Sequence, residues 1–174
     1  MAGGQDGGDG MKAIMAAMLA ASTIGGGIAE CASASSGTVR KPPYWASISA
    51  GEARMRTGPG RNYPASWLYQ RQGLPVQVLE VYPGWRKVRD PDGAEGWMIG
   101  NLVSDQRTGM VKSGVADLRD TPNPGAKILW RAEAGVIGRI SRCGGGWCKI
   151  DVHGRGGYVE EDRLWGVDSG EIVD

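Results

Sequence analysis

The sequence is poor in the residues that most often carry chemistry. Its 174 residues include one His, three Cys and no Phe, and its formal net charge is 20 − 19 = +1. One His and three Cys leave little material for a metal site or a Cys/His nucleophile pair. A net charge near zero argues against nucleic acid as the main partner, because phosphate binding needs a clustered basic surface. The composition therefore predicts no metal, no cofactor and no nucleic acid.

Glycine is abundant, by contrast, and its 30 residues imply many tight turns, which favours a β protein. Helical periodicity is absent after residue 40. Short segments such as 75–82 (PVQVLEVY) are rich in β-branched residues and end at turn residues such as Pro83-Gly84. We therefore predict an all-β fold.

The first 34 residues have the composition of a targeting segment. Residues 1–10 are polar and rich in Gly, and we expect a disordered start there. The basic Lys12, an apolar run from Ala13 to Ile24 and the small residues 32–34 (ASA) follow in the order of a secretory signal. This order predicts cleavage after Ala34 and export to the periplasm. The apolar run is too short to span a bilayer core of about 30 Å, so no transmembrane segment is predicted.

Two alternatives stay open for this segment. It could form a short N-terminal helix of a cytosolic protein, or Cys31 could be the lipid-modified residue of a lipoprotein. Glu30 stands where a small residue is expected before such a Cys. Cleavage after Ala34 would remove Cys31 and leave Cys143 and Cys148, an even number that suits a disulfide in an exported chain.

Internal repetition is the most informative feature of the sequence. Five blocks recur in the same order, at offsets of 61 to 63 residues. The matched blocks are 53–56 with 116–119, 73–74 with 135–136, 85–88 with 147–150, 96–98 with 157–159, and Leu102 with Leu164. We predict two similar units at 44–104 and 108–167, followed by an acidic tail at 168–174.

The residues of the first unit resemble the bacterial SH3 (SH3b) family. The pattern comprises residues 53–60 (ARMRTGPG), Gly73, 84–88 (GWRKV) and Gly96-Trp97. The second unit departs from it, with residues 119–124 (RDTPNP) at the turn and Tyr158 in place of Trp97. The resemblance implies two tandem small SH3-like barrels after the N-terminal signal segment. It also implies a non-enzymatic binding or scaffolding role at the cell envelope, towards peptides or peptidoglycan.

Aromatic residues are the best candidates for ligand contact, because SH3-like barrels hold extended ligands against flat rings in shallow grooves. Packing is the competing interpretation for each of them. The candidates are Tyr63, Tyr82 and Trp85 in the first unit, and Trp130, Trp147 and Tyr158 in the second.

Cys143, Cys148 and His153 have the spacing C-x4-C-x4-H. A structural zinc site needs four ligands, and only Asp151 is nearby as the fourth. We predict instead a disulfide between Cys143 and Cys148 that fixes the register of the hairpin carrying residues 144–146 (GGG), with two free thiols as the alternative. His153 is expected at a hairpin turn.

Three functions follow from these features. The leading hypothesis is a non-catalytic exported binding module that contacts a peptide or a peptidoglycan fragment in the cell envelope. The alternative is a structural or assembly protein that binds another envelope protein. An enzyme such as a cell-wall peptidase is disfavoured, because the two barrel units use nearly all of the expected mature chain and leave little room for a catalytic domain.

Overall fold

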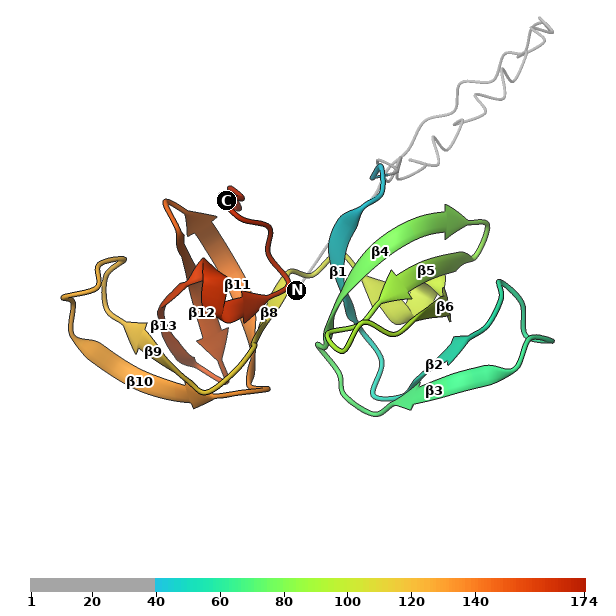
Figure 1. Cartoon of the computed structure of the whole chain (residues 1–174), viewed down its shortest axis with the longest axis horizontal. Helices are drawn as coiled ribbons and strands as arrows, with labels where there is room; N and C mark the ends of the chain where they lie inside the picture. The colour runs from blue at the N-terminus through green and yellow to red at the C-terminus, as the bar shows by residue number, and fades with distance from the viewer. Residues whose placement is uncertain (1–39) are drawn as a thin grey trace, which may run out of the picture. The chain divides into compact units, whose positions relative to one another are not determined.

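The computed structural model describes residues 40–174. The predicted signal segment, its Ala34 cleavage site and Cys31 therefore lie outside the described residues. Residues 40–174 form two seven-stranded antiparallel sheets and two single-turn 3-10 helices, which confirms the predicted all-β fold (Figure 1). Among these residues no helix is long and apolar enough to cross a membrane.

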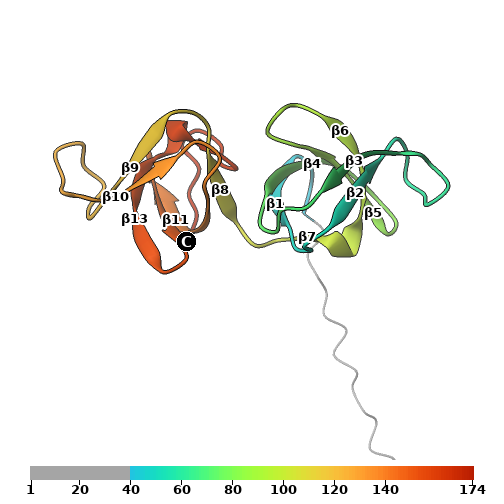
Figure 2. The ribbon, with the colours of Figure 1, turned by 90° about the horizontal axis from the view of Figure 1, so that it is seen from below.

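The first sheet has the strand order β3-β2-β6-β5-β4-β1-β7, and we refer to it as the first barrel. Its short last strand β7 pairs with β1 (Figure 2). The elements are β1 (Tyr44–Ile48), β2 (Ala53–Arg56), β3 (Ala65–Tyr69), β4 (Pro75–Tyr82), β5 (Trp85–Arg89), β6 (Glu95–Ile99), η1 (Gly100–Leu102) and β7 (Val103–Ser104).

The second sheet, which we call the second barrel, repeats the first element by element. Its order, β10-β9-β13-β12-β11-β8-β14, is the order of the first sheet with every strand number raised by seven. The elements are β8 (Thr108–Val111), β9 (Val115–Arg119), β10 (Ile128–Glu133), β11 (Ile137–Gly144), β12 (Trp147–Val152), β13 (Arg155–Glu160), η2 (Glu161–Arg163) and β14 (Leu164–Trp165). The internal repeat inferred from the sequence is therefore a structural repeat.

The strand pairing corrects one of the five residue matches between the two units, that of Leu102 with Leu164. Ile48 pairs with Val103 in the first barrel, and its equivalent Val111 pairs with Leu164 in the second. Leu164 is thus the counterpart of Val103, and Leu102 corresponds to Arg163 at the end of the 3-10 turn. The match of Leu102 with Leu164 was wrong by one residue. It paired two identical side chains, whereas strand pairing places Leu164 opposite the equivalent of Ile48.

Each barrel encloses its own apolar core. In the first barrel Ile48, Met55, Val78, Val88 and Met98 are completely buried. The second barrel buries their counterparts, and the set is Val111, Leu118, Ile140, Ile150 and Val159. Met55, Val88, Leu118 and Ile150 lie between charged neighbours along their strands, which is the pattern expected when one face of a sheet lines a core.

In each barrel a glycine lies where the penultimate strand runs beside the second strand: β6 beside β2 in the first barrel, and β13 beside β9 in the second. Gly96 on β6 faces β2, and a Cβ atom there would lie 2.4 Å from Met55 Cγ and 2.7 Å from the Arg56 carbonyl oxygen. Gly157 has the same place in the second barrel, where a Cβ atom would lie 2.8 Å from Leu118 Cβ. Both positions therefore require a residue without a side chain.

The turn between β5 and β6 is built around a buried carboxylate. Asp90 is only 5% exposed, and its Oδ1 accepts hydrogen bonds from the amides of Asp92 at 3.0 Å and Ala94 at 2.8 Å. Its Oδ2 accepts a 2.7 Å hydrogen bond from the Tyr69 hydroxyl. Asp90 therefore ties the β5–β6 turn to the edge strand β3.

Both barrels lie in one compact unit, and side-chain contacts join them, including Met110 and Ile137, which pack against the first core. The rings of Trp45 on β1 and Trp165 on β14 meet edge to face, with centroids 4.9 Å apart. The indole nitrogen of Trp165 also donates a 3.2 Å hydrogen bond to the Pro75 carbonyl. Trp165 is thus held by packing.

Candidate binding surfaces

The six aromatic candidates from the sequence divide into two groups by exposure. Tyr82, Tyr63 and Trp130 are 52%, 43% and 43% exposed. Trp85, Trp147 and Tyr158 are half-buried. The first group therefore offers more surface for direct contact with a ligand than the second.

The position of the Tyr63 ring requires glycines in the turn that precedes it. Its ring lies against Gly58 and Gly60, where a Cβ atom on Gly58 would come within 2.5 Å of the ring carbons. The Arg56 guanidinium donates a 2.7 Å hydrogen bond to the Tyr63 carbonyl. Arg119 makes the equivalent bond to the Ala126 carbonyl in the second barrel, also at 2.7 Å. The arginine of the motif thus holds the loop in both barrels.

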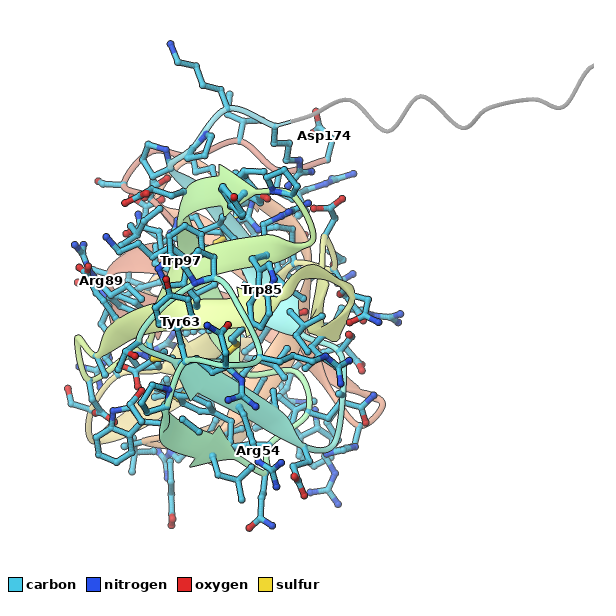
Figure 3. All side chains as sticks on the ribbon, turned by 90° about the vertical axis from the view of Figure 1, so that its right-hand side faces the viewer. Arg54, Tyr63, Trp85, Arg89, Trp97 and Asp174 are labelled. Carbon is cyan, nitrogen blue, oxygen red and sulfur yellow. A yellow bond between two sulfur atoms is a disulfide. The ribbon has the colours of Figure 1, made fainter. Side chains whose placement is uncertain are left out.

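Aromatic side chains line one side of the first barrel (Figure 3). Tyr82 and Trp97 pack edge to face with centroids 6.3 Å apart, and Trp97 on β6 pairs with Arg56, which holds the Tyr63 loop. Trp85 is the cross-strand partner of Tyr82. Tyr82 thus contacts Trp97 and pairs with Trp85. Tyr63, in contrast, is linked to Trp97 only through Arg56.

In the second barrel, cations lie over two of the aromatic rings. The Arg155 guanidinium lies 4.8 Å from the Trp130 ring centroid, and the Lys149 ammonium lies 5.8 Å from that of Tyr158. Trp147 lines a separate groove beside Val159. The three aromatic candidates of this barrel therefore do not form one cluster.

Trp67 is the residue that sequence reasoning missed. It lies on β3 and is 59% exposed, more than any of the six candidates. Trp67 pairs with Met55, and Trp130 pairs with Leu118, the equivalent of Met55. Each barrel therefore displays one exposed tryptophan at the same position of its edge strand. The 63-residue offset between Trp67 and Trp130 was the available signal.

The two barrels also share a shallow groove at one position, and both grooves contain three arginines. In the first barrel the groove has a volume of about 190 Å³ and contains Arg54, Arg56, Arg61 and Glu52. In the second it has about 250 Å³, and Asp117 stands where the first has Arg54. Asp117 accepts ion pairs from Arg119 at 3.0 Å and Arg131 at 3.2 Å. The first groove is therefore the more basic of the two.

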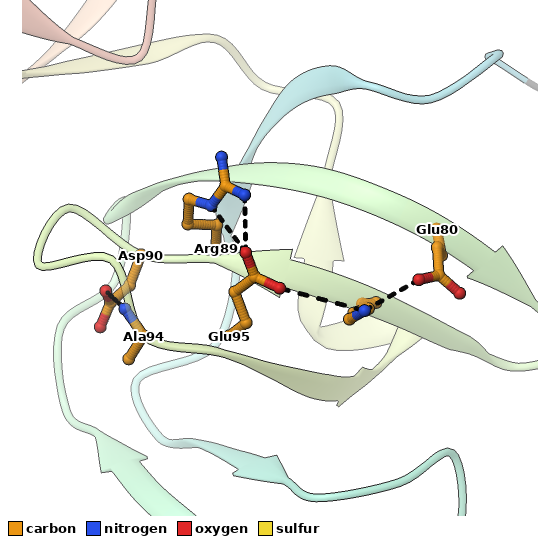
Figure 4. Close-up of polar contacts among 6 residues, drawn as sticks. Glu80, Arg89, Asp90, Ala94 and Glu95 are labelled. Carbon is orange, nitrogen blue, oxygen red and sulfur yellow. Dashed lines mark hydrogen bonds and ion pairs between the residues drawn. The ribbon is translucent and has the colours of Figure 1, made fainter.

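Two of the three cations in the basic run 86–89 (RKVR) are paired with carboxylates. Lys87 pairs with Glu80 at 2.8 Å and Glu95 at 3.9 Å, and Arg89 pairs with Glu95 at 2.6 Å (Figure 4). The Glu80 carboxylate raises the pKa of Lys87 above its usual value. Exposed pairs of this kind contribute little to stability.

The predicted disulfide is present in the second barrel. Cys143 and Cys148 are a cross-strand pair of β11 and β12, with their sulfurs 2.01 Å apart and both residues buried. The intervening turn uses Gly145 and Gly146, both at positive φ (62° and 81°), as a two-residue hairpin requires. The Cys143 backbone also pairs with Val173 near the C-terminus.

Removing the disulfide should loosen the second barrel selectively. The double substitution Cys143→Ala/Cys148→Ala is expected to lower the free energy of unfolding by about 2 kcal/mol, because the closed loop is short. Urea unfolding with and without reductant measures this, with the double variant as a control that reductant should not affect. Equal stability of the oxidised and reduced wild-type protein would contradict the expectation.

His153 has a structural position. It is exposed, at φ 53°, and forms with Gly154 (φ 83°) the two-residue turn between β12 and β13, as the sequence predicted. The Gly154 amide donates to Asp151 Oδ1 at 3.0 Å. Within residues 40–174 no group of three or more His, Cys, Asp or Glu side chains is arranged to hold a metal ion.

The comparison with protein families identifies the repeat. The bacterial SH3 domain family matches residues 49–105 and 112–166, one copy for each barrel. The chain belongs to this family and consists of two tandem bacterial SH3 domains in its described part.

Known proteins similar to this chain are larger. It is 25% identical over 132 residues to YrvJ of Bacillus subtilis (strain 168), which is named as a candidate N-acetylmuramoyl-L-alanine amidase, covering 67% of this chain and 24% of that protein. Among solved structures it resembles NlpC1 of Trichomonas vaginalis (TM-score 0.33, 15% identity, 73% of this chain and 47% of that one). An NlpC/P60 family protein of Bacillus cereus gives a TM-score of 0.32 at 13% identity, with 70% and 55% covered. The chain thus spans about a quarter of the curated relative.

Proposed function

We propose that this protein is a non-catalytic binding module that contacts peptidoglycan or its peptides at the cell envelope. Its family supports a binding role, and N-acetylmuramoyl-L-alanine, after which the curated relative is named, is the junction of glycan and peptide in peptidoglycan. The match to that relative covers a quarter of its length. The proposal therefore concerns binding and does not extend to amidase activity.

The observation that carries the proposal is the pair of exposed tryptophans on equivalent edge strands. A large aromatic ring gains more from burial than most side chains, and Trp is highly buried on average. Two copies of one fold that both expose Trp at the same position, Trp67 and Trp130, favour a surface that a ligand covers. Tyr63 and Tyr82 add exposed rings to the first barrel.

The proposed location is outside the cytoplasm. A buried cross-strand disulfide, Cys143–Cys148, is typical of proteins that fold under oxidising conditions. Cleavage after Ala34 remains part of the proposal, and N-terminal sequencing of the exported protein tests it. An N-terminus at Cys31 carrying a lipid would favour the lipoprotein alternative.

Retention on purified peptidoglycan sacculi tests the binding role. The double substitution Trp67→Ala/Trp130→Ala should reduce the retained fraction by about tenfold, because loss of an exposed aromatic contact typically costs 1 kcal/mol or more. These residues are better targets than the half-buried Trp85, whose loss would also disturb packing. The double substitution Leu68→Ala/Leu129→Ala is the matched control, since these leucines are exposed neighbours on the same strands.

Two outcomes would overturn the proposal. Absence of retention of the folded wild-type protein would favour the assembly role, in which an envelope protein is the partner. Release of soluble muropeptides from the sacculi by the purified protein would contradict the non-catalytic part.

A further inference from the structure

The two barrels differ in the side chains at one end. This end lies between the edge strand, β3 or β10, and the hairpin turn that follows β5 or β12. In the first barrel Tyr69, the cross-strand partner of Ala53, fills this end and donates its hydroxyl to Asp90. Burial and the Asp90 carboxylate raise the pKa of Tyr69 above its usual value. Tyr69 and Asp90 thus close this end of the barrel.

Neither of these residues is retained in the second barrel. Ala116, the equivalent of Ala53, pairs with Ala132, so alanine stands in the place of Tyr69. Val152 stands in the place of Asp90, because both follow the buried core residue of their strand, Ile150 or Val88, by two positions. An aromatic ring and its acceptor are thereby replaced by two small apolar side chains.

At this end the second barrel has a pocket that is open to solvent, and we call it the cavity of the second barrel. It has a volume of about 290 Å³, and its apolar wall comprises Leu118, Ala132, Val136 and Val152. This is roughly twice the size of an apolar protein cavity of about 150 Å³ that accepts benzene. The cavity therefore has room for a branched aliphatic or an aromatic side chain.

A cation lies at the opening of this cavity. Trp130 and Arg155 both line it, with the guanidinium 4.8 Å from the ring centroid, and Arg155 is exposed. In the described part of the chain Arg155 makes no ion pair, whereas Arg131 beside it is held by Asp117 at 3.2 Å. Arg131 and Glu133 complete the polar part of the lining, so Arg155 is the lining arginine that a ligand carboxylate can pair with in competition only with Glu133.

We propose that this cavity of the second barrel binds an apolar side chain of a peptide that carries a carboxylate on the same residue, and that Arg155 pairs with that carboxylate. The proposal rests on the binding function proposed above and adds its ligand class and its position. It also gives the two barrels different roles, since Tyr69 occupies the corresponding space in the first.

Three small probes test the proposal by NMR of the Trp130 indole N–H in the full protein. N-acetyl-leucine is expected to shift this signal in a saturable manner. N-acetylglycine should bind at least about tenfold more weakly, because burial of a leucine side chain is worth about 1.5–3 kcal/mol. N-acetyl-leucine amide should bind about two- to fivefold more weakly than the acid, as expected for loss of one exposed ion pair.

Two variants locate the site. Arg155→Gln should make the acid and the amide bind equally, and it changes only an exposed side chain. Ala132→Tyr/Val152→Asp transplants the closure of the first barrel and should abolish the shift, whereas Leu129→Ala, on the same strand but outside the cavity, should preserve it. Equal binding of N-acetylglycine and N-acetyl-leucine, or an acid preference that survives Arg155→Gln, would overturn the proposal.

The probe measurements contain no cell wall, so the two proposals can fail separately. Saturable N-acetyl-leucine binding without retention on sacculi would overturn only the peptidoglycan proposal. Retention on sacculi without any probe-induced shift of Trp130 would overturn only the cavity proposal.

Discussion

Replacement of Gly96 by Ala is expected to lower the free energy of unfolding of the first barrel by about 2–3 kcal/mol, since overpacking of a well-packed core typically costs 1–3 kcal/mol. The added Cβ atom would lie 2.7 Å from the Arg56 carbonyl oxygen. Backbone at a strand crossing cannot move aside as a flexible side chain can. Urea unfolding followed by tryptophan fluorescence measures the change.

Gly51→Ala is the matched control, because a Cβ atom there meets no other atom within 4 Å. Its stability should stay within about 0.5 kcal/mol of the wild type. If Gly96→Ala were equally well tolerated, β2 and β6 could not cross as closely as described.

Replacement of Asp90 by Ala is the second large effect, with an expected loss of about 3 kcal/mol. Asp90 accepts three hydrogen bonds in a buried position, and each donor left unsatisfied by its removal costs about 1–3 kcal/mol unless water reaches it. Asp92→Ala is the control, since Asp92 is exposed in the same turn. Similar stability of the two variants would contradict a central role for Asp90.

The same contact makes the first barrel sensitive to high pH. Burial and Asp90 raise the pKa of Tyr69 in the folded state, so the stabilisation is complete below the unfolded pKa of about 10 and is lost as pH rises above it. Tyr69→Phe should remove this dependence while retaining the ring.

Much of the fold could be predicted from the sequence because the sequence contains two copies of the same unit. The recurrence of the Trp85 and Trp147 blocks and of the Gly96 and Gly157 blocks located equivalent strands without knowledge of any contact. The disulfide followed from two cysteines separated by a glycine turn. Register at Leu102 did not follow, because only the pairing of Ile48 with Val103 and of Val111 with Leu164 reveals it.

The binding surfaces were harder to predict. Nearly every residue of β3 is exposed, so the strand lacks the apolar alternation that reveals a half-buried strand, and Trp67 went unnoticed within it. The cavity of the second barrel arises from residues that are absent, which a search for functional side chains does not detect. Aligning Tyr69 with Ala132 through the repeat would have indicated it.

Two separate cores have a consequence for any calorimetric experiment on this protein. Cooperative melting requires that the loss of one part make the rest unstable. The barrels touch through Trp45 and Trp165 and through Met110 and Ile137, which pack against the first core, but contacts within each barrel are far more numerous. Heat absorption should therefore resolve into two overlapping events, and one midpoint fitted to the whole curve would describe neither. Gly96→Ala would then displace one event and leave the other in place.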